Sequence, residues 1–595
     1  VPSPKPQGNP MLGSANAPME QMDSAVRPNL ATGGGPTGAT PVSRTNTQFG
    51  DVDEADLVKT DGRYLYQYRF DSASGEAEVA IVGATNLKLM STIPVDKSES
   101  GADAEMYLLG DHLVLVQSAA QERVDETLAP LDTPMTALLP EGETGRELIV
   151  PDYYKNKSYA GRAEMMELVV YDVTDRSAPK ETSRLAQEGV YVSSRMSDHT
   201  VYLVTNKRVR GEMLYGEAPL ARTVLPVVAE NQTAKLVDAA DILLPPYIER
   251  PCYTVISALD LDTGKTSTKA VLGAAGELMM NSDSLFITST VQDEGFNTGI
   301  TRFVLDKTDV KYVSSGMVPG TIDNQFSLDE YNGNLRIATT SYNREKQANV
   351  NNLYVLDPKM KQLGAVEDLA EGESIKSVRF MDDTAYVVTF RQTDPLFVID
   401  LSDPKKPVVK GELKIPGFSE YLHPIDENTL VGIGYNTLTN RYGNVMTDGL
   451  KLSLFDVSDP TDPTETASLL LGNIGSESEA LSNHRAVMWY PEMRLLGFPA
   501  TLYTVRGTSA DDPWSGDHTL AFAGYLVVRV NDDGFEVVGQ LANDQSAQGF
   551  LRYDLDSSIE RGLYIGKTLY TAAPGKLTAY SMDDFKQIGE LVYPK

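Results

Sequence analysis

From about residue 50 onward, hydrophobic residues alternate with polar ones in short runs that end at turn residues. SVRFMDDTAYVVTF (377–390) places two such runs on either side of Asp382-Asp383, and DPLFVIDLSDPKKPVVKGEL (394–413) adds two more. Alternation with a period of two, rich in β-branched and aromatic residues, is typical of strands with one buried face. The pattern therefore predicts a unit of four short antiparallel strands.

This four-strand unit recurs along the chain. Repetition at a fixed period of about 45 to 50 residues is typical of propellers, whose blades are four-stranded sheets arranged around a central channel. We count about nine copies, while typical rings have four to eight blades, so the sequence predicts an all-β β-propeller of eight or nine blades. Further first hairpins are EMYLLGDHLVLVQS (105–118), VYVSSRMSDHTVYLVTN (190–206), GELMMNSDSLFITST (276–290) and FSEYLHPIDENTLVGIGY (418–435).

Two insertions and an N-terminal tail depart from this repeat. Residues 1–45 are rich in Pro, Gly, Ser and Ala and lack the apolar surface that would offset ordering entropy, so we expect an extended tail followed by one propeller domain over residues 46–595. The insertions, at about 118–165 and 207–252, join the two halves of a blade and should emerge on a rim, where propellers often bind ligands. The spacing of Leu236, Val237, Ala240, Ile242 and Leu243 predicts a short helix over 233–245.

Three stretches carry a resemblance to a known family. They are NTQFGDVDEADLVKTDGRYLY (46–66), the run from Ser377 to Tyr435, and GLKLSLFDVSDPTDP (449–463). Together they resemble the secreted prokaryotic proteins with a β-propeller domain distantly related to WD-40 repeats, and the similarity covers essentially residues 45–595. The resemblance implies an exported or cell-surface propeller. It supplies no catalytic residues, because the family has no assigned activity.

Charge and cysteine content narrow the classes of partner. Lys and Arg total 52 against 83 Asp and Glu, giving a net charge of −31, which would repel a polyphosphate, so we expect no nucleic-acid partner. The single cysteine, Cys252, permits no internal disulfide and no Cys-rich zinc site.

No apolar run approaches the roughly 20 residues that span a bilayer, so we expect no membrane-spanning segment. A chain that begins at Val1 rather than Met fits either an exported protein whose signal or anchor has been removed or a chain shortened at this end, and we expect an extracellular or cell-surface location.

A dense group of acids precedes the first blade and is the candidate metal site. Asp51, Asp53, Glu54 and Asp56 offer the carboxylate oxygens that calcium prefers. The alternative is that these acids bind nearby amides or pair with Lys59 and Arg63. Calcium is the only cofactor that the sequence indicates.

A second group of charged residues comes from aligning the first strand of each unit on its turn acid. The innermost strand of each blade lines the channel, so equivalent positions should form a ring at one depth. This ring could bind a cation or a polar ligand, or it could be a solvated channel wall. Its members would be Glu105, Glu277, Lys376, Glu420 and Glu479, with His423 and His484 close by.

The sequence gives no catalytic motif in a suitable context, so no catalytic residue is assigned. Trp514, in DDPWSGDH (511–518), is a residue type that contacts carbohydrate, which makes a glycan a candidate partner. We predict a non-catalytic binding or assembly module that interacts with proteins or with itself, with polymerisation through its tail. The alternative is a carbohydrate- or peptide-directed hydrolase or lyase that uses Glu420 and Glu479, because paired carboxylates can divide acid and base roles.

Overall fold

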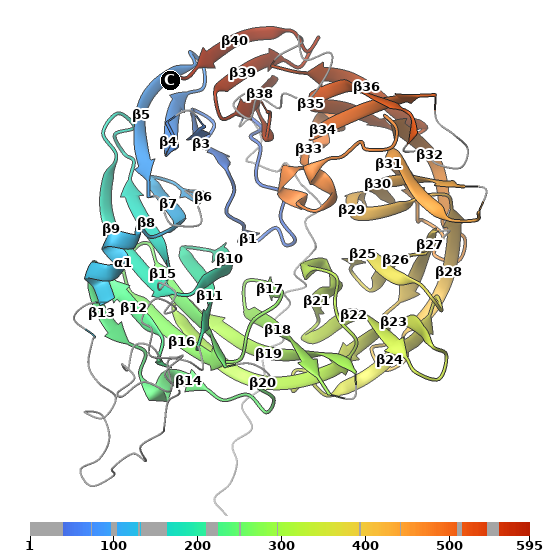
Figure 1. Cartoon of the computed structure of the whole chain (residues 1–595), viewed down its shortest axis with the longest axis horizontal. Helices are drawn as coiled ribbons and strands as arrows, with labels where there is room; N and C mark the ends of the chain where they lie inside the picture. The colour runs from blue at the N-terminus through green and yellow to red at the C-terminus, as the bar shows by residue number, and fades with distance from the viewer. Residues whose placement is uncertain are drawn as a thin grey trace, which may run out of the picture.

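Nine β-sheets stand around a common centre in the computed structural model, which confirms the all-β propeller and sets the blade number at nine (Figure 1). The structure describes residues 40–72, 74–96, 104–128, 131, 164–209, 224–248, 251–293, 295–391, 394–440, 442–507, 515–543 and 558–594. Most of the predicted tail, residues 1–39, and Trp514 lie outside these ranges. No helix within them is long and apolar enough to cross a membrane.

Seven blades are simple four-stranded antiparallel sheets whose strands follow one another in chain order. Blade 1 consists of β2 (Val58–Thr60), β3 (Tyr64–Asp71), β4 (Glu76–Gly83) and β5 (Lys88–Val95). Blade 4 consists of β17 (Leu278–Met280), β18 (Ser284–Gln292), β19 (Phe296–Asp306) and β20 (Asp309–Pro319). Blade 5 consists of β21 (Leu328–Tyr331), β22 (Asn334–Asn343), β23 (Ala348–Leu356) and β24 (Gln362–Leu369). Blade 6 consists of β25 (Ser374–Met381), β26 (Thr384–Phe390), β27 (Asp394–Asp400) and β28 (Val408–Ile415). Blade 7 consists of β29 (Phe418–Asp426), β30 (Thr429–Thr439), β31 (Val445–Asp456) and β32 (Thr464–Leu471). Blade 8 consists of β33 (Met488–Tyr490), β34 (Leu495–Arg506), β35 (Asp517–Asn531) and β36 (Gly534–Leu541). Blade 9 consists of β37 (Arg561–Ile565), β38 (Thr568–Ala573), β39 (Lys576–Ser581) and β40 (Gln587–Val592).

Blades 2 and 3 each gain two strands: the second insertion adds two to blade 2 and one to blade 3, and the chain before blade 1 adds another to blade 3. The core of blade 2 is β6 (Ala104–Leu109), β7 (His112–Ser118), β8 (Met165–Asp172) and β9 (Lys180–Glu188). The core of blade 3 is β10 (Val190–Ser197), β11 (Thr200–Arg208), β15 (Cys252–Asp260) and β16 (Thr266–Leu272). The hairpin of β12 (Val227–Glu230) and β13 (Thr233–Leu236) extends blade 2 beyond β9, while β14 (Ile242–Leu243) pairs with β16 and β1 (Val52–Asp53) pairs with β10.

The helix predicted over 233–245 is wrong. That stretch forms β13, a short 3₁₀ turn at Ala239–Asp241 and β14. Here β13 pairs with its neighbour β12, which itself pairs with the outer strand β9, and β14 pairs with the outer strand β16. This strand pairing outweighs the local helical spacing. The helix α1 (Gln121–Leu128) lies in the first insertion, and its buried Val124 and Leu128 pack against Val227 and Ala229 of β12. The two insertions therefore pack together on the outer side of blade 2 (Figure 1).

Glycines in the outermost strands allow neighbouring blades to approach closely. A Cβ atom added to Gly364 or Gly411 would lie 2.7 Å from the carbonyl oxygen of Pro404 or 2.5 Å from that of Pro460. Each proline belongs to the turn between the third and fourth strands of the next blade. Because the glycine has no side chain, that turn can pack directly against the glycine backbone. The same relation joins Gly316 to Met360, Gly539 to Phe585 and, between the last blade and the first, Gly589 to Leu87.

Side chains join blade 9 to blade 1, and each of these blades is built from one continuous stretch of chain. The Tyr593 hydroxyl donates to Gln67 Oε1 at 2.8 Å, and Gln67 Nε2 donates to the carbonyl of Ala573 at 2.7 Å. Arg69 Nε donates to the carbonyl of Pro574 at 2.9 Å. An apolar cluster buries residues of both blades around these bonds: Val58, Leu65, Ala80, Val82, Ala84, Leu563, Tyr570, Ala572, Leu577, Ala579 and Tyr593.

Candidate functional site

The predicted channel residues all lie on, or just before, the innermost strands of their blades. Glu105 belongs to β6, Lys376 to β25, and Glu420 and His423 to β29. Glu277 directly precedes β17, whereas Glu479 and His484 lie in two 3₁₀ turns, Glu479–Leu481 and His484–Ala486, that precede β33. The first-strand alignment therefore selected positions around the centre of the ring.

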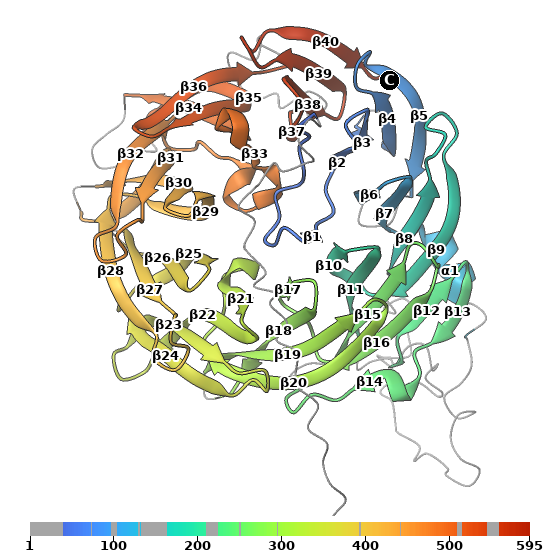
Figure 2. The ribbon, with the colours of Figure 1, turned by 180° about the vertical axis from the view of Figure 1, so that it is seen from behind.

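The chain before blade 1 runs through this centre; we call residues 40–56 the channel segment (Figures 1 and 2). It begins beside blade 9, where Val42 bridges to Ile565. Asn46 Nδ2 then donates to the Tyr421 hydroxyl at 2.9 Å and to the His484 carbonyl at 2.8 Å, and β1 pairs with β10 of blade 3. The segment thus contacts blades on opposite sides of the ring before it enters blade 1.

Glu54 is one of two buried acids of the channel segment; like Asp56, it has 4% of its surface exposed. Its carboxylate lies 3.1 Å from His484 Nε2, accepts a hydrogen bond from Gln325 Nε2 at 3.1 Å and stands 3.7 Å from Arg195. Burial acts to raise the pKa of Glu54, but the charges of Arg195, His484 and Arg485 outweigh it and hold the pKa well below its usual range. Glu54 is therefore an ionised group that links blades 3, 5 and 8.

Asp56 makes a second buried ion pair, with Arg561 of blade 9. Arg561 Nε donates to the Asp56 carboxylate at 2.8 Å, and its Nη1 donates to Glu479 at 2.9 Å. Arg485 pairs with Glu105 at 2.6 Å and also donates to the carbonyl of Ala55 at 2.5 Å. Two of the predicted channel acids, Glu105 and Glu479, are thus engaged by arginines that also hold the channel segment.

The other predicted ring members gather on blades 4 to 7. Lys376 Nζ stands 3.4 Å from Glu420, and the pKa of Glu420 is nevertheless raised because burial outweighs that contact. Burial also raises the pKa of Glu277, against the charge of Arg195. Asp323, which the sequence did not single out, has a pKa raised to about 6 by burial and by the charge of Glu420. The acidic side chains on blades 4 to 7 therefore have fewer basic partners than those on the side of the ring that the channel segment occupies.

The two channel histidines have different surroundings. His484 faces Glu54, whereas His423 is 2% exposed, lies 3.2 Å from the Tyr421 hydroxyl through Nδ1 and meets the edge of Trp489. Burial and the charge of Arg379 lower the pKa of His423 to about 3, so it is neutral at ordinary pH. His423 is placed as a packed core residue rather than as a proton carrier.

The four acids of the candidate calcium site point to separate partners. Asp53 pairs with Lys59 at 2.8 Å, one of the two predicted alternatives, while Glu54 and Asp56 face arginines on distant blades and Asp51 is exposed. Across the described part of the chain, no three His, Cys, Asp or Glu side chains are grouped so that they could hold a metal ion. Calcium binding stays a prediction.

The sequence did not identify the arginines that organise this centre. Three such arginines, Arg195, Arg485 and Arg561, lie on or next to innermost strands. The feature that could have identified them in the sequence is a basic residue at a channel-facing position in a chain with a net charge of −31. An isolated buried charge is costly, so an inward arginine implies a carboxylate partner. Sequence alone could not show that the partners come from the segment before blade 1.

A family profile covers most of the chain, and two relatives match parts of it. The profile described as "Beta propeller domain" matches residues 42–585. An uncharacterized protein of Archaeoglobus fulgidus is 38% identical over 274 residues, which cover 46% of this chain and 36% of the relative. An uncharacterized protein of Methanocaldococcus jannaschii is 44% identical over 205 residues, covering 34% of this chain and 30% of the relative. The matched regions thus span about a third of the length of these curated relatives.

Solved structures are similar only at the level of general form. A putative 6-phosphogluconolactonase from Bacteroides fragilis matches with a TM-score of 0.29 and 13% identity, covering 57% of this chain and 90% of that one. The β-propeller domain of the Trilobed protease from Pyrococcus furiosus matches with a TM-score of 0.27 and 9% identity, covering 69% and 98%. At these scores neither protein's activity bears on this chain.

Proposed function

The chain belongs to the β-propeller domain family, and from this premise we propose that it is a non-catalytic binding and assembly module that works outside the cell. Its rigid ring would present rim elements and the N-terminal tail to protein partners, including other copies of the same chain. Propellers host both enzymes and binding proteins, so the proposal depends on the site rather than on the fold.

The observation that carries this proposal is that three of the predicted channel carboxylates contact basic side chains of the chain itself. Glu105 and Glu479 contact arginines, and Glu420 contacts Lys376. Acid–base catalysis needs carboxyl groups that can reach a substrate, whereas Glu479 and Glu420 each face a cation of the protein itself. The channel segment also occupies the centre through which a substrate would approach. These contacts favour binding at the outer surfaces.

The insertions supply one such surface, because they make one side of the ring different from the rest. The second insertion adds β12, β13 and β14 to blades 2 and 3, while the first supplies α1. Leu244 and Ile248 follow β14 with 68% and 48% of their surfaces exposed. Exposed apolar side chains on an irregular rim favour a protein partner.

The start of the described chain supports a role for the tail. The Gly566 amide donates to the carbonyl of Pro41 at 2.7 Å, which fixes residues 40–43 at the turn between β37 and β38. The described chain therefore begins at a defined point beside blade 9. A tail that precedes this point could add to an exposed strand edge of a neighbour, and such contacts form filaments when they do not close.

Electron microscopy and sedimentation velocity test the proposal on the full chain and on a chain lacking residues 1–39. We expect assemblies of the full chain and single rings of the shortened one, with equal melting temperatures because the channel segment is retained. A chain whose residues 1–39 are replaced by a Gly/Ser sequence of equal length is the matched control and should also fail to assemble. Single rings of the full chain, or assemblies that survive the deletion, would contradict self-assembly through the tail.

A further inference from the structure

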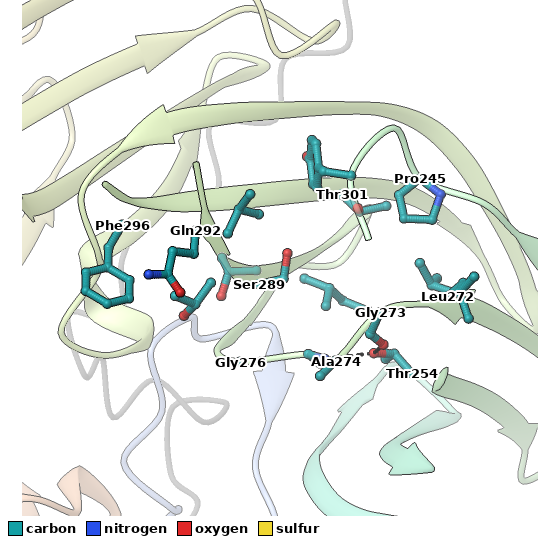
Figure 3. Close-up of a pocket in the computed structure, with 17 residues that line it drawn as sticks. Pro245, Thr254, Leu272, Gly273, Ala274, Gly276, Ser289, Gln292, Phe296 and Thr301 are labelled. Carbon is teal, nitrogen blue, oxygen red and sulfur yellow. Dashed lines mark hydrogen bonds between the residues drawn. The ribbon is translucent and has the colours of Figure 1, made fainter. Parts of the chain in front are cut away.

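A pocket of about 200 Å³ lies between blades 3 and 4, away from the channel network (Figure 3). One side is formed by the link from β16 to β17, and another by the end of β18 and by Phe296 and Thr301 of β19. Pro245 and Tyr247, from the insertion of blade 3, complete the lining. This volume is smaller than that of typical drug-sized sites, which matches a ligand of about one ring.

The insertion is fixed over the pocket by Tyr247. The Tyr247 hydroxyl accepts a hydrogen bond from the Ile300 amide at 3.0 Å and donates to the Ile300 carbonyl at 2.9 Å. Gly299 makes room for the ring, because a Cβ atom there would lie 2.5 Å from Tyr247 Cε2. With β14 paired to blade 3 and Tyr247 bonded to blade 4, the insertion spans the junction and forms a fixed wall.

The link between the blades has small residues and a fixed backbone. Gly273 has φ of +134°, a conformation that other residues rarely adopt, and its carbonyl accepts from the Thr254 hydroxyl at 2.9 Å. The Ala275 amide donates to Thr254 Oγ1 at 2.8 Å. Because Gly273, Ala274, Ala275 and Gly276 carry little or no side chain, their small size leaves the pocket open. The site is thus largely pre-formed.

The lining is uncharged although the chain is strongly acidic. Its 17 described residues include no Asp, Glu, Lys, Arg or His, whereas charged residues make up 23% of the whole chain. The Thr254 and Thr288 hydroxyls already bond the backbone of the link, at Gly273, Ala275 and Glu277. Further hydroxyl groups come from Ser289, Thr290 and Thr301, and Gln292 adds an amide. An ionic ligand would lose water without gaining a counter-charge here, while a neutral ligand with several hydroxyls can exchange hydrogen bonds with these groups.

Phe296 supplies an apolar face at this polar pocket. It lines the pocket, and 61% of its surface is exposed (Figure 3). An aromatic ring that the core does not use can pack against the C–H face of a sugar while neighbouring groups bond its hydroxyls. We infer that the pocket between blades 3 and 4 binds one ring of an uncharged carbohydrate.

An array of neutral and acidic oligosaccharides, followed by calorimetry with the strongest neutral probe, tests this inference on the full chain. We expect binding to neutral hexose or N-acetylhexosamine probes. Phe296→Ala, which removes the apolar face, and Ala274→Leu, which fills the pocket, should each weaken binding by about tenfold or more. Tyr342→Ala is the matched control, because Tyr342 is an equally exposed aromatic residue (63%) on β22 of blade 5 and should leave the affinity unchanged.

Three outcomes would overturn the inference. They are no binding to any neutral probe, stronger binding to uronate or sulfated probes, and neutral-probe binding that both pocket variants leave unchanged. Melting temperatures equal to that of the wild type establish that the variants are folded. Because assembly is read separately by electron microscopy, loss of sugar binding leaves the proposed assembly role untouched.

Discussion

Asp56 and Arg561 are 505 positions apart in the sequence, yet Arg561 Nε lies 2.8 Å from the Asp56 carboxylate. Asp56 precedes the first strand of blade 1 and Arg561 begins the first strand of blade 9. Since these two blades exchange no described strand, the ion pair is a direct link between the two ends of the ring. Both side chains are almost fully buried, at 6% and 5% exposed.

Removing one partner of this pair should destabilise the ring strongly. We expect Asp56→Ala to lower the free energy of unfolding by about 3–5 kcal/mol, because Arg561 keeps a buried charge with one counter-ion fewer. Asp56→Ala combined with Arg561→Met should recover part of that loss. Urea unfolding and melting temperature give the measurement. Lys567→Met, in an exposed pair with Asp583, is the control and should cost less than about 1 kcal/mol; an equally small effect of Asp56→Ala would refute the closing role.

The channel segment should matter for stability in a way that residues before it do not. A chain starting at residue 40 keeps the bonds of Asn46 to Tyr421 and His484, whereas a chain starting at residue 51 loses them together with the bridge of Val42 to Ile565. We expect the first chain to melt like the full one and the second to melt several degrees lower. Differential scanning calorimetry makes the comparison, and equal melting of all three chains would show that residues 40–50 contribute nothing to the ring.

Glu560, next to Arg561, should give the ring a pH-dependent stability. Burial and the charges of Glu479 and Asp56 raise the pKa of Glu560 to about 7, against the opposing charge of Arg561. A carboxyl whose pKa is higher in the folded state than in the unfolded one, where it is near 4.5, costs stability as pH rises from about 4.5 to 7. Glu560→Gln should remove this loss and stabilise the protein by roughly 1–2 kcal/mol at pH 8, but not at pH 4. Melting curves across pH test this, and a gain of equal size at both pH values would rule out titration of Glu560 as the cause.

The repeat pattern was sufficient to predict the fold, because each blade is a local unit whose alternation and turns are visible in sequence. Asp-Pro turns such as those at Pro404 and Pro460 lie between the third and fourth strands, where the pattern placed them. The stretch 233–245 was misread because its strands belong to sheets: β13 pairs with β12, which in turn pairs with β9, and β14 pairs with β16, and β9 and β16 belong to other parts of the chain. Edge pairing over such separations leaves no period in the local sequence.

The candidate site was predictable only in part. Aligning first strands selected Glu105, Lys376 and Glu420 as central positions, because that alignment depends on the repeat alone. It could not reveal that Glu105 faces Arg485 rather than another acid, since the partner depends on how blades 2 and 8 are placed around the ring. The pocket beside Phe296 gave no sequence signal, because it arises where an insertion crosses a blade junction.

Gly411 tests the contact that joins neighbouring blades. A Cβ atom at this position would lie 2.5 Å from the Pro460 carbonyl oxygen and 2.8 Å from Pro463 Cδ, and both atoms belong to a turn whose Asp459 side chain bonds the backbone amide of Thr461. A turn fixed in this way can move aside only by shifting backbone, so we expect Gly411→Ala to cost about 1–3 kcal/mol and to lower the melting temperature.

Gly295→Ala is the matched control for Gly411→Ala. Apart from its chain neighbours, no described residue has an atom within 4 Å of the Cβ position at Gly295, and its φ is not in the left-handed region, so this substitution should be neutral or slightly stabilising. Urea unfolding of both variants separates the effect of the blade contact from the general effect of replacing glycine in this chain. Equal stabilities would mean that the blades can separate slightly without cost. A loss confined to Gly411→Ala would identify close backbone packing as a force that holds each blade to the next, and by the same geometry Gly589 to Leu87 where the ring closes.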